Sequence, residues 1–314
     1  MSKIANIPNL DLGDYCKGPS ADRNQFINHL GSAFRSHGFV IISGHFLDRQ
    51  TMDALYDQLA RVFALPESLK QSYRRPDWSH QRGYTGFMTE HAKDQSSPDL
   101  KEFWQIGQAE QVGEASGLAN IACLEVPDFL PVALRAFAAL ERTGVTLLSA
   151  LGVYLGLGDD YLTEPCLGGQ SILRAIHYPP IGDPPPGSVR AAAHEDINLI
   201  TLLIGASAPG LEIATVEGEW LAVTVQEGQL VCNLGDMLAR LTNDNLPSTP
   251  HRVVNPQGQA AQHSRYSVPF FMHPRSEMRL DPIPKFVSDT NPARYKPMTA
   301  GEYLAERLRE IGLE

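Results

Sequence analysis

The sequence has few cysteines and a deficit of basic residues, and both features exclude classes of protein. Its four cysteines lie far apart and form no C-x-x-C pair, which argues against a disulfide framework and against a zinc knuckle. Lys and Arg number 26 against 36 Asp and Glu, a net charge of −10, so we expect no nucleic-acid partner. The chain also lacks an uninterrupted apolar run long enough to span a membrane. These absences favour a cytoplasmic protein with no membrane partner.

Several catalytic signatures are missing as well. There is no G-x-S-x-G elbow and no P-loop, and "LGLGDDY" lacks the last glycine of a dinucleotide-binding motif. The sequence therefore disfavours a serine hydrolase of the elbow type, a P-loop nucleotide enzyme and a Rossmann dehydrogenase.

The two halves of the chain have different hydrophobic patterns. Apolar spacing in the first half predicts helices over residues 24–38 and 49–63, a short strand over 39–42 between them, and a longer helix within 128–158. From residue 171 onward, short apolar runs alternate with Gly, Pro and Asn, as in a sandwich or barrel. We predict a mainly β fold with flanking helices, in which residues 1–125 form a helical and mixed region that packs on a core formed by residues 126–314.

The segment "HEDINLITLL" places His194, Asp196 and Asn198 at alternate positions. Side chains in a strand alternate between its two faces, so a strand here would point all three polar groups the same way. The His-x-Asp pair alone fits a structural hydrogen bond equally well. A later strand, "HRVV", begins with His251, and an antiparallel sandwich can return it beside the first. Two imidazoles and one carboxylate form the facial ligand set of non-haem Fe(II) oxygenases, although a zinc hydrolase uses a similar set.

A second pair of polar residues interrupts the apolar strand "RYSVPFF". Arg265 and Ser267 are two residues apart and share a face of this strand. A buried charge is costly without a partner, and no acid lies nearby in sequence. A bound carboxylate is the natural counterion, because guanidinium forms a bidentate fork with it. A zinc hydrolase would not explain this pair.

Several segments, in order along nearly the whole chain, resemble the 2-oxoglutarate/Fe(II)-dependent dioxygenase superfamily, and specifically its isopenicillin N synthase-like branch. They are "IPNLDL", "AFRSHGFVIISGH", "RGY", "KEFWQIG", "IHYPP", "HEDINLITLL", "NLGDML", "TPHRVVNP" and "RYSVPFF". The resemblance implies a double-stranded β-helix (jelly roll) core. It also implies iron ligands and cosubstrate-binding residues, namely His194, Asp196 and His251 for Fe(II), and Arg265, Ser267 and Tyr178 for 2-oxoglutarate. His177 and Glu195 depart from the usual residues of the branch.

The resemblance further implies oxidation of a C–H bond in a small-molecule substrate by O2, with release of succinate and CO2. Hydroxylation, desaturation and cyclisation all remain open, with ascorbate as an auxiliary reductant and the chain acting as a monomer or weak homo-oligomer. Three alternatives stay open. They are an Fe(II) oxidase of the isopenicillin N synthase type that uses no 2-oxoglutarate, an ethylene-forming breakdown of 2-oxoglutarate, and a non-catalytic jelly-roll binding module.

Other polar and aromatic residues receive a structural interpretation first. Arg174 either meets a substrate anion or is solvated or paired with an acid. Phe270 and Phe271 are interpreted first as core residues, with a place in the pocket lining open for one of them. Four further residues are interpreted as structural: Asn233 and Asp236 in a turn between strands, and His263 and His273 at the surface or in packing.

Overall fold

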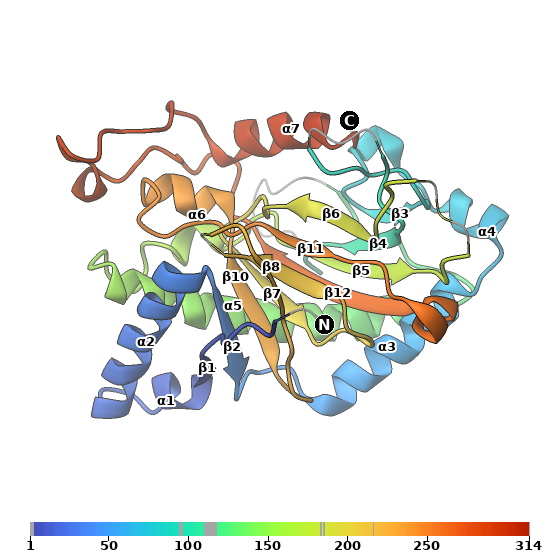
Figure 1. Ribbon diagram of the computed structural model, residues 1–314, viewed down its shortest axis with the longest axis horizontal. Helices are drawn as coiled ribbons and strands as arrows, with labels where there is room; N and C mark the ends of the chain where they lie inside the picture. The colour runs from blue at the N-terminus through green and yellow to red at the C-terminus, as the bar shows by residue number, and fades with distance from the viewer. Residues whose placement is uncertain are drawn as a thin grey trace.

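Two facing β-sheets form the centre of the protein in the computed structural model, which describes residues 3–93, 97–109, 118–182, 184, 186–215 and 217–313 (Figure 1). In these ranges the larger sheet has the order β1-β2-β10-β7-β12-β5-β4-β3, and the smaller has the order β6-β11-β8-β9. The strands are β1 (Asn9–Asp11), β2 (Phe39–Ser43), β3 (Gly83–Thr85), β4 (Glu102–Ile106), β5 (Ile172–Tyr178), β6 (Ala191–His194), β7 (Ile200–Ile204), β8 (Leu211–Ala214), β9 (Trp220–Ala222), β10 (Leu230–Leu234), β11 (His251–Val253) and β12 (Arg265–Met272). This confirms the predicted jelly roll with flanking helices.

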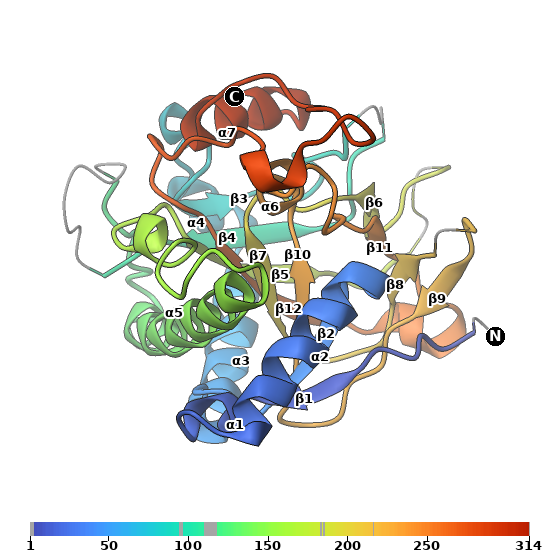
Figure 2. The ribbon, with the colours of Figure 1, turned by 90° about the vertical axis from the view of Figure 1, so that its left-hand side faces the viewer.

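The helices cover the outer face of the larger sheet and one end of the sandwich. They are α1 (Leu12–Cys16), α2 (Ala21–His37), α3 (Arg49–Phe63), α4 (Glu67–Ser72), α5 (Phe129–Tyr154), α6 (Asp236–Leu241) and α7 (Ala300–Glu310). In Figures 1 and 2, α7 lies at the end of the molecule opposite α1. The predicted helix over 49–63 and the end of the first helix at Gly38 are confirmed, since Gly38 adopts φ 67° as the left-handed cap of α2.

Strand β12 shows how alternation separates the two sides of the larger sheet. Val268, Phe270 and Met272 are fully buried on the helix side, where the rings of Phe137 in α5 and Phe270 meet edge to face at 4.9 Å between centroids. The intervening residues of β12, beginning with Arg265, face the interior of the sandwich. A single strand thus contributes to the core under α5 and to the polar interior.

The first 125 residues contribute strands as well as helices to this body. β1 pairs in parallel with β2, β2 pairs with β10, and β4 pairs with β5. The N-terminal region is therefore joined to the sandwich by backbone hydrogen bonds, and the boundary near residue 125 stays a prediction.

Helix α5 is long and apolar enough to cross a membrane by length and composition. More than half of its most apolar stretch is buried inside the protein, against α2, α3 and the larger sheet. Burial of this kind is what the central helix of a folded domain requires.

Candidate active site

The predicted metal ligands come together where the smaller sheet meets the turn that leads to the larger one. His194 ends β6, His251 begins β11, and the two residues face one another as direct partners in the antiparallel ladder. Asp196 follows two residues after β6. Its Oδ1 lies 3.8 Å from Nε2 of His194 and 3.7 Å from Nε2 of His251, and the three ligand atoms lie within 4.8 Å of one another.

The prediction that one strand carries His194, Asp196 and Asn198 on a single face is wrong. β6 stops at His194, and residues 195–199 form the turn that carries the chain to β7 in the other sheet. Alternation within a strand therefore does not align these side chains. The crossing between sheets instead turns the Asp196 carboxylate back toward both histidines, and it leaves Asn198 buried and bonded to Thr201 at 2.8 Å.

Both histidines present Nε2 for coordination. Nδ1 of His194 donates to the carbonyl of Ala192 at 2.7 Å, and Nδ1 of His251 donates to the carbonyl of Thr249 at 3.2 Å. Donation by Nδ1 leaves the Nε2 lone pair free in the neutral ring, which is the form that binds a metal. Burial lowers the pKa of His251 to about 4, so this imidazole is neutral at physiological pH.

Two buried donors hold the other oxygen of Asp196. Thr201 Oγ1 and Asn233 Nδ2 donate to Oδ2 at 2.6 and 2.8 Å, and Thr201 and Asn233 are direct partners in the β7–β10 ladder. Asn233 is therefore a strand residue that orients the carboxylate, and its interpretation as a turn residue is wrong. A polar residue inside the apolar run "LVCNL" is the signal that points to such a role.

The same carboxylate remains ionised despite its burial. Burial raises the pKa of Asp196, but the charges of His251 and His194 and the bonds from Asn233 and Thr201 lower it more strongly, so the net shift is downward. The interpretation of Asp236 as a turn residue is also wrong, because Asp236 begins the helix α6. Its backbone N–H donates to the carbonyl of Asp196 at 2.8 Å. With one carboxylate oxygen held by the protein and the Nε2 atoms of two imidazoles opposite the other, the donor set fits Fe(II).

The predicted cosubstrate residues lie at the start of β12. Arg265 is the direct partner of Tyr178 across the β12–β5 ladder, and its Cζ lies 4.9 Å from the centroid of the Tyr178 ring. Arg265 is only 1% exposed, and Ser267 is also buried. Nε of Arg265 donates to the carbonyl of Ala208 at 3.0 Å, while Nη1 has no partner among the described residues. A buried guanidinium with an unused donor fits the carboxylate of a dicarboxylic acid.

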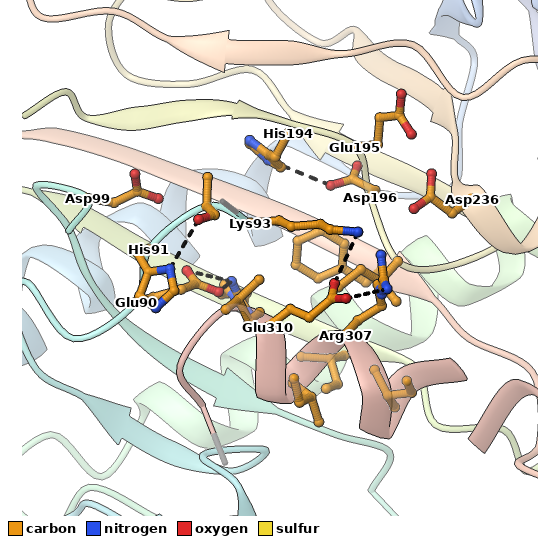
Figure 3. A pocket seen from close by; sticks show the side chains of 18 of the residues that line it. Glu90, His91, Lys93, Asp99, His194, Glu195, Asp196, Asp236, Arg307 and Glu310 are labelled. Atoms are coloured by element: carbon orange, nitrogen blue, oxygen red, sulfur yellow. Dashed lines mark hydrogen bonds and ion pairs between the residues drawn. The ribbon is translucent and has the colours of Figure 1, made fainter. Parts of the chain in front are cut away.

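A cavity of about 400 Å³ opens beside the metal ligands. Figure 3 shows His194 and Asp196 on one wall and Arg307 and Glu310 of α7 on the opposite one. Lys93 extends toward Glu310, with which it forms an ion pair at 3.4 Å. The C-terminal helix thus closes the mouth of the sandwich, a role that no local pattern in its sequence predicts.

The inner wall of the cavity carries buried ion pairs. Arg174 bonds to Glu90 at 3.0 Å, and Lys101 bonds to Glu90 at 2.7 Å and to Asp99 at 2.8 Å. Burial would raise the pKa of Glu90, but the charges of Arg174 and Lys101 lower it to about 2. The guanidinium of Arg174 also lies 5.2 Å from the ring centroid of Phe271, which lines the cavity. Arg174 is therefore both paired with an acid and placed beside a substrate-sized space.

Two further residues that line the cavity, His273 and Glu195, have shifted pKa values. His273 lines the cavity and is buried, and its Nδ1 meets no partner in the described part of the chain; burial lowers its pKa to about 4. Burial and the neighbouring carboxylate of Asp236 raise the pKa of Glu195 to about 8, so this acid holds a proton near neutral pH. His273 continues the inward alternation of β12 beyond Phe271, and that continuation was a usable signal.

Two further histidines lie away from the cavity. Nδ1 of His177 bonds to Glu102 at 2.7 Å, and its Nε2 bonds to Ser264 at 2.9 Å. The ring of His177 also stacks on Tyr266 at 4.9 Å between centroids. His263 is exposed, as predicted.

Comparison with known proteins identifies the family. Residues 169–274 match the profile of the 2OG-Fe(II) oxygenase superfamily, and residues 7–125 match that of the N-terminal region of a non-haem dioxygenase in morphine synthesis. The crystal structure of a protein assigned to the 2OG-Fe(II) oxygenase family in Caulobacter crescentus is 38% identical, covers 99% of each chain and superposes with a TM-score of 0.85. The chain belongs to the 2OG-Fe(II) oxygenase family.

Other relatives of this 2OG-Fe(II) oxygenase are also named for 2-oxoglutarate or were solved with it bound. A 2-oxoglutarate-Fe(II) type oxidoreductase of Aspergillus fumigatus is 28% identical over 98% of this chain and 94% of its own. A Neurospora crassa protein solved in complex with alpha-KG and thymine is 25% identical, covers 98% of this chain and 99% of its own, and has a TM-score of 0.85. The protein is an Fe(II)- and 2-oxoglutarate-dependent dioxygenase, which confirms the predicted superfamily, enzyme class and cofactors.

Proposed function

We propose that this dioxygenase hydroxylates a small, polar, nitrogen-containing ring compound, which it holds in the cavity between the His194–Asp196–His251 triad and α7. The observation that carries the proposal is the composition of the cavity wall. Fe(II) held by the triad would activate O2, with one oxygen atom used to oxidise 2-oxoglutarate to succinate and CO2 and the other available to hydroxylate a C–H bond of the substrate. The chain's own residues bind, orient and enclose the substrate.

Charge balance in the cavity favours a polar but weakly charged substrate. Arg174 and Lys101 are already neutralised by Glu90 and Asp99, so neither cation is free to bind a strong anion on this wall. Neutral His273 offers an Nδ1 in the lining that bonds to no other described residue. Amide, imide and amine groups offer the donors and acceptors that suit such a wall.

The ring preference rests on Phe271 and on size. Phe271 presents an aromatic surface next to the Arg174 guanidinium, and a flat ring can stack on it. A cavity of about 400 Å³ lies at the small end of the range of ligand pockets, about 300–1,000 Å³. Two relatives point to this substrate class: the Neurospora crassa protein was solved with thymine and with 5-formyluracil, and a 28% identical protein of Petromyces alliaceus is a proline hydroxylase.

The test is a substrate panel. Anaerobically reconstituted Fe(II) protein is mixed with 2-oxoglutarate, ascorbate and air, and succinate release is measured with pyrimidines, cyclic imino acids and acyclic amides. We expect ring compounds to stimulate release, and the product to gain one oxygen atom, derived from labelled O2. Stimulation by acyclic compounds only, or a product without added oxygen, would overturn the proposed substrate class or reaction.

The Arg174→Gln variant tests the wall itself. It should raise the KM for the stimulating ring compound and leave the anaerobic absorbance band of the Fe(II)–2-oxoglutarate complex intact, because Arg174 lies on the substrate side. A lost band would mean that Arg174 serves the cosubstrate.

A separate part of the proposal concerns the protein's cellular compartment, oligomeric state and macromolecular partners. We place it in the cytoplasm as a monomer or weak homo-oligomer, with no nucleic-acid or membrane partner. The net charge of −10 supports the absence of a polyanion partner, and the burial of α5 supports the absence of a membrane span.

A further inference from the structure

A second buried arginine lies near the cosubstrate end of the sandwich. Arg190 directly precedes β6, is 1% exposed, and belongs to the largest fully buried side chains of the described residues. Its Nη2 donates to the carbonyl of His263 at a long 3.3 Å, and its Nε bonds to none of these residues. No ion pair joins Arg190 or Arg265 to an Asp or Glu in the part of the chain that the structure describes. Buried charges without a counterion are rare and costly.

The two guanidinium groups share one neighbour. Cζ of Arg190 lies 5.8 Å, and Cζ of Arg265 4.9 Å, from the centroid of the Tyr178 ring. Burial first and then the charge of Arg265 lower the pKa of Arg190, and Tyr178 partly offsets this lowering. The two guanidinium groups are therefore close enough to repel each other. Two cations around one ring leave an excess of positive charge in the interior. An anionic ligand is the partner that removes this excess.

We propose that Arg190 is a second guanidinium for the distal carboxylate of 2-oxoglutarate, which it shares with Arg265. The inference rests on the proposed cosubstrate role of Arg265 and Ser267. Neither Arg190 nor Arg265 is among the residues that line the cavity beside the metal ligands, so both guanidinium groups lie apart from the space that we propose for the primary substrate. The arrangement makes the cosubstrate end selective for a dicarboxylic 2-oxo acid.

The backbone at Arg190 is held independently of its side chain. Its N–H donates to Oδ1 of Asn255 at 2.9 Å, and Nδ2 of Asn255 donates to the carbonyl of Ser188 at 2.9 Å. Replacement of the guanidinium by an amide therefore leaves the start of β6 anchored. Arg190→Gln is expected to fold.

The experiment measures binding rather than turnover. Anaerobic Fe(II) protein is titrated with 2-oxoglutarate, and separately with 2-oxopentanoate, which lacks the distal carboxylate, while the metal-to-ligand charge-transfer absorbance is followed. Arg190→Gln should weaken 2-oxoglutarate by about 10- to 100-fold, as expected for loss of one partner of a buried charge pair. It should leave the affinity for 2-oxopentanoate nearly unchanged.

Arg252→Gln is the matched control. Arg252 lies on β11 in the smaller sheet, but it pairs with Glu212 at 2.8 Å and its side chain is 35% exposed. This variant should bind both ligands like the parent. If Arg190→Gln weakens both ligands equally, or weakens neither, Arg190 is a structural residue and the inference is wrong.

Arg265→Gln separates this failure from failure of the proposed cosubstrate site. If Arg265→Gln selectively weakens 2-oxoglutarate and Arg190→Gln does not, the site stands and only the role of Arg190 falls. If neither variant changes 2-oxoglutarate affinity, the distal carboxylate binds elsewhere, and both assignments fall.

Discussion

Replacement of Asn233 by Leu tests whether the second oxygen of Asp196 must be held by the protein. Asn233 is buried on β10 and donates to Oδ2 at 2.8 Å, whereas Oδ1 faces the two imidazoles. Leu has the same branching of side-chain heavy atoms, although its methyl groups are bulkier, and it removes the amide donor together with the amide acceptor. We expect Asn233→Leu to fold and to bind Fe(II) more weakly, because the carboxylate loses part of its fixed orientation.

The magnitude follows from the kind of bond that is lost. A hydrogen bond to a charged group contributes about 1.5–3 kcal/mol, which corresponds to roughly 10- to 150-fold in a binding constant. The donor to Oδ2 from Thr201, at 2.6 Å, remains in the variant and limits the loss. We therefore expect a decrease in Fe(II) affinity of about 10- to 100-fold, the range typical of changes in groups that orient metal ligands.

The assay is anaerobic equilibrium dialysis against Fe(II), with thermal unfolding of the metal-free protein measured in parallel. Cys232→Ala is the control, because Cys232 is the adjacent residue on β10 and is fully buried in the core on the helix side. It should lower stability by about 1 kcal/mol and leave Fe(II) affinity unchanged. Fe(II) affinity of Asn233→Leu within twofold of the parent, or an equal loss in Cys232→Ala, would refute the reasoning.

Three further predictions concern the cosubstrate, turnover and pH. Arg265→Ala should weaken 2-oxoglutarate binding by about 2–5 kcal/mol and so raise the concentration needed for half-maximal succinate release, far more than Arg174→Ala does. Equal effects of the two variants would contradict the assignment of Arg265. Without primary substrate, the Fe(II) protein should release succinate slowly in air, and Asp196→Ala should abolish this release; persistent release would remove Asp196 from the metal site. Because the pKa of Glu90 is lowered from 4.5 to about 2, its ion pairs contribute about 3 kcal/mol that is complete above pH 4.5 and lost as the pH falls toward 2. Glu90→Gln should flatten the fall in melting temperature across that window, and an unchanged pH profile would contradict the assignment.

Local sequence patterns predicted the elements whose environment is simple. The α3 helix, Arg49–Phe63, has the predicted bounds because its apolar positions recur on one face and its ends carry ordinary capping signals. The short strands of the second half likewise predicted a sandwich. In these segments the local pattern and the tertiary contacts favour the same structure.

The error at Asp196 has a different cause. The strand pattern of "HEDINLITLL" spans two strands of two different sheets, β6 and β7, and the functional carboxylate lies in the turn between them. Periodicity describes a face within one strand and carries no information on where a chain changes sheets. The chemistry of the ligand set still indicates Asp196, which lies beside both histidines, even though the predicted local geometry is wrong.

Contacts between distant segments account for what the sequence did not indicate. Asn233 reaches Asp196 only because β10 and β7 are neighbours in the larger sheet, and Arg307 reaches the cavity only because α7 folds over the mouth of the sandwich. The sequence around Arg307 gives no sign of its contact with the cavity, and the only sign at Asn233 is a polar residue inside the apolar run of β10. A polar side chain inside an apolar strand therefore merits a functional hypothesis before a structural one when a metal site is already suspected.

The alternation of β12 connects these observations into one account of selectivity. Arg265 and Ser267 lie at the end of β12 that we propose for the cosubstrate, and Phe271 lies on the same face at the end that lines the cavity. Paired acids neutralise the cations of the substrate end, whereas Arg265 and Arg190 at the cosubstrate end pair with no acid of the described chain. Because one strand backbone fixes both ends, the distance between the two ligands is set by the sheet and not by flexible loops. On this proposal, selectivity for a dianion comes from Arg265 in β12 and from Arg190 just before β6, whereas selectivity for the primary substrate depends on the side chains of the cavity wall and of α7.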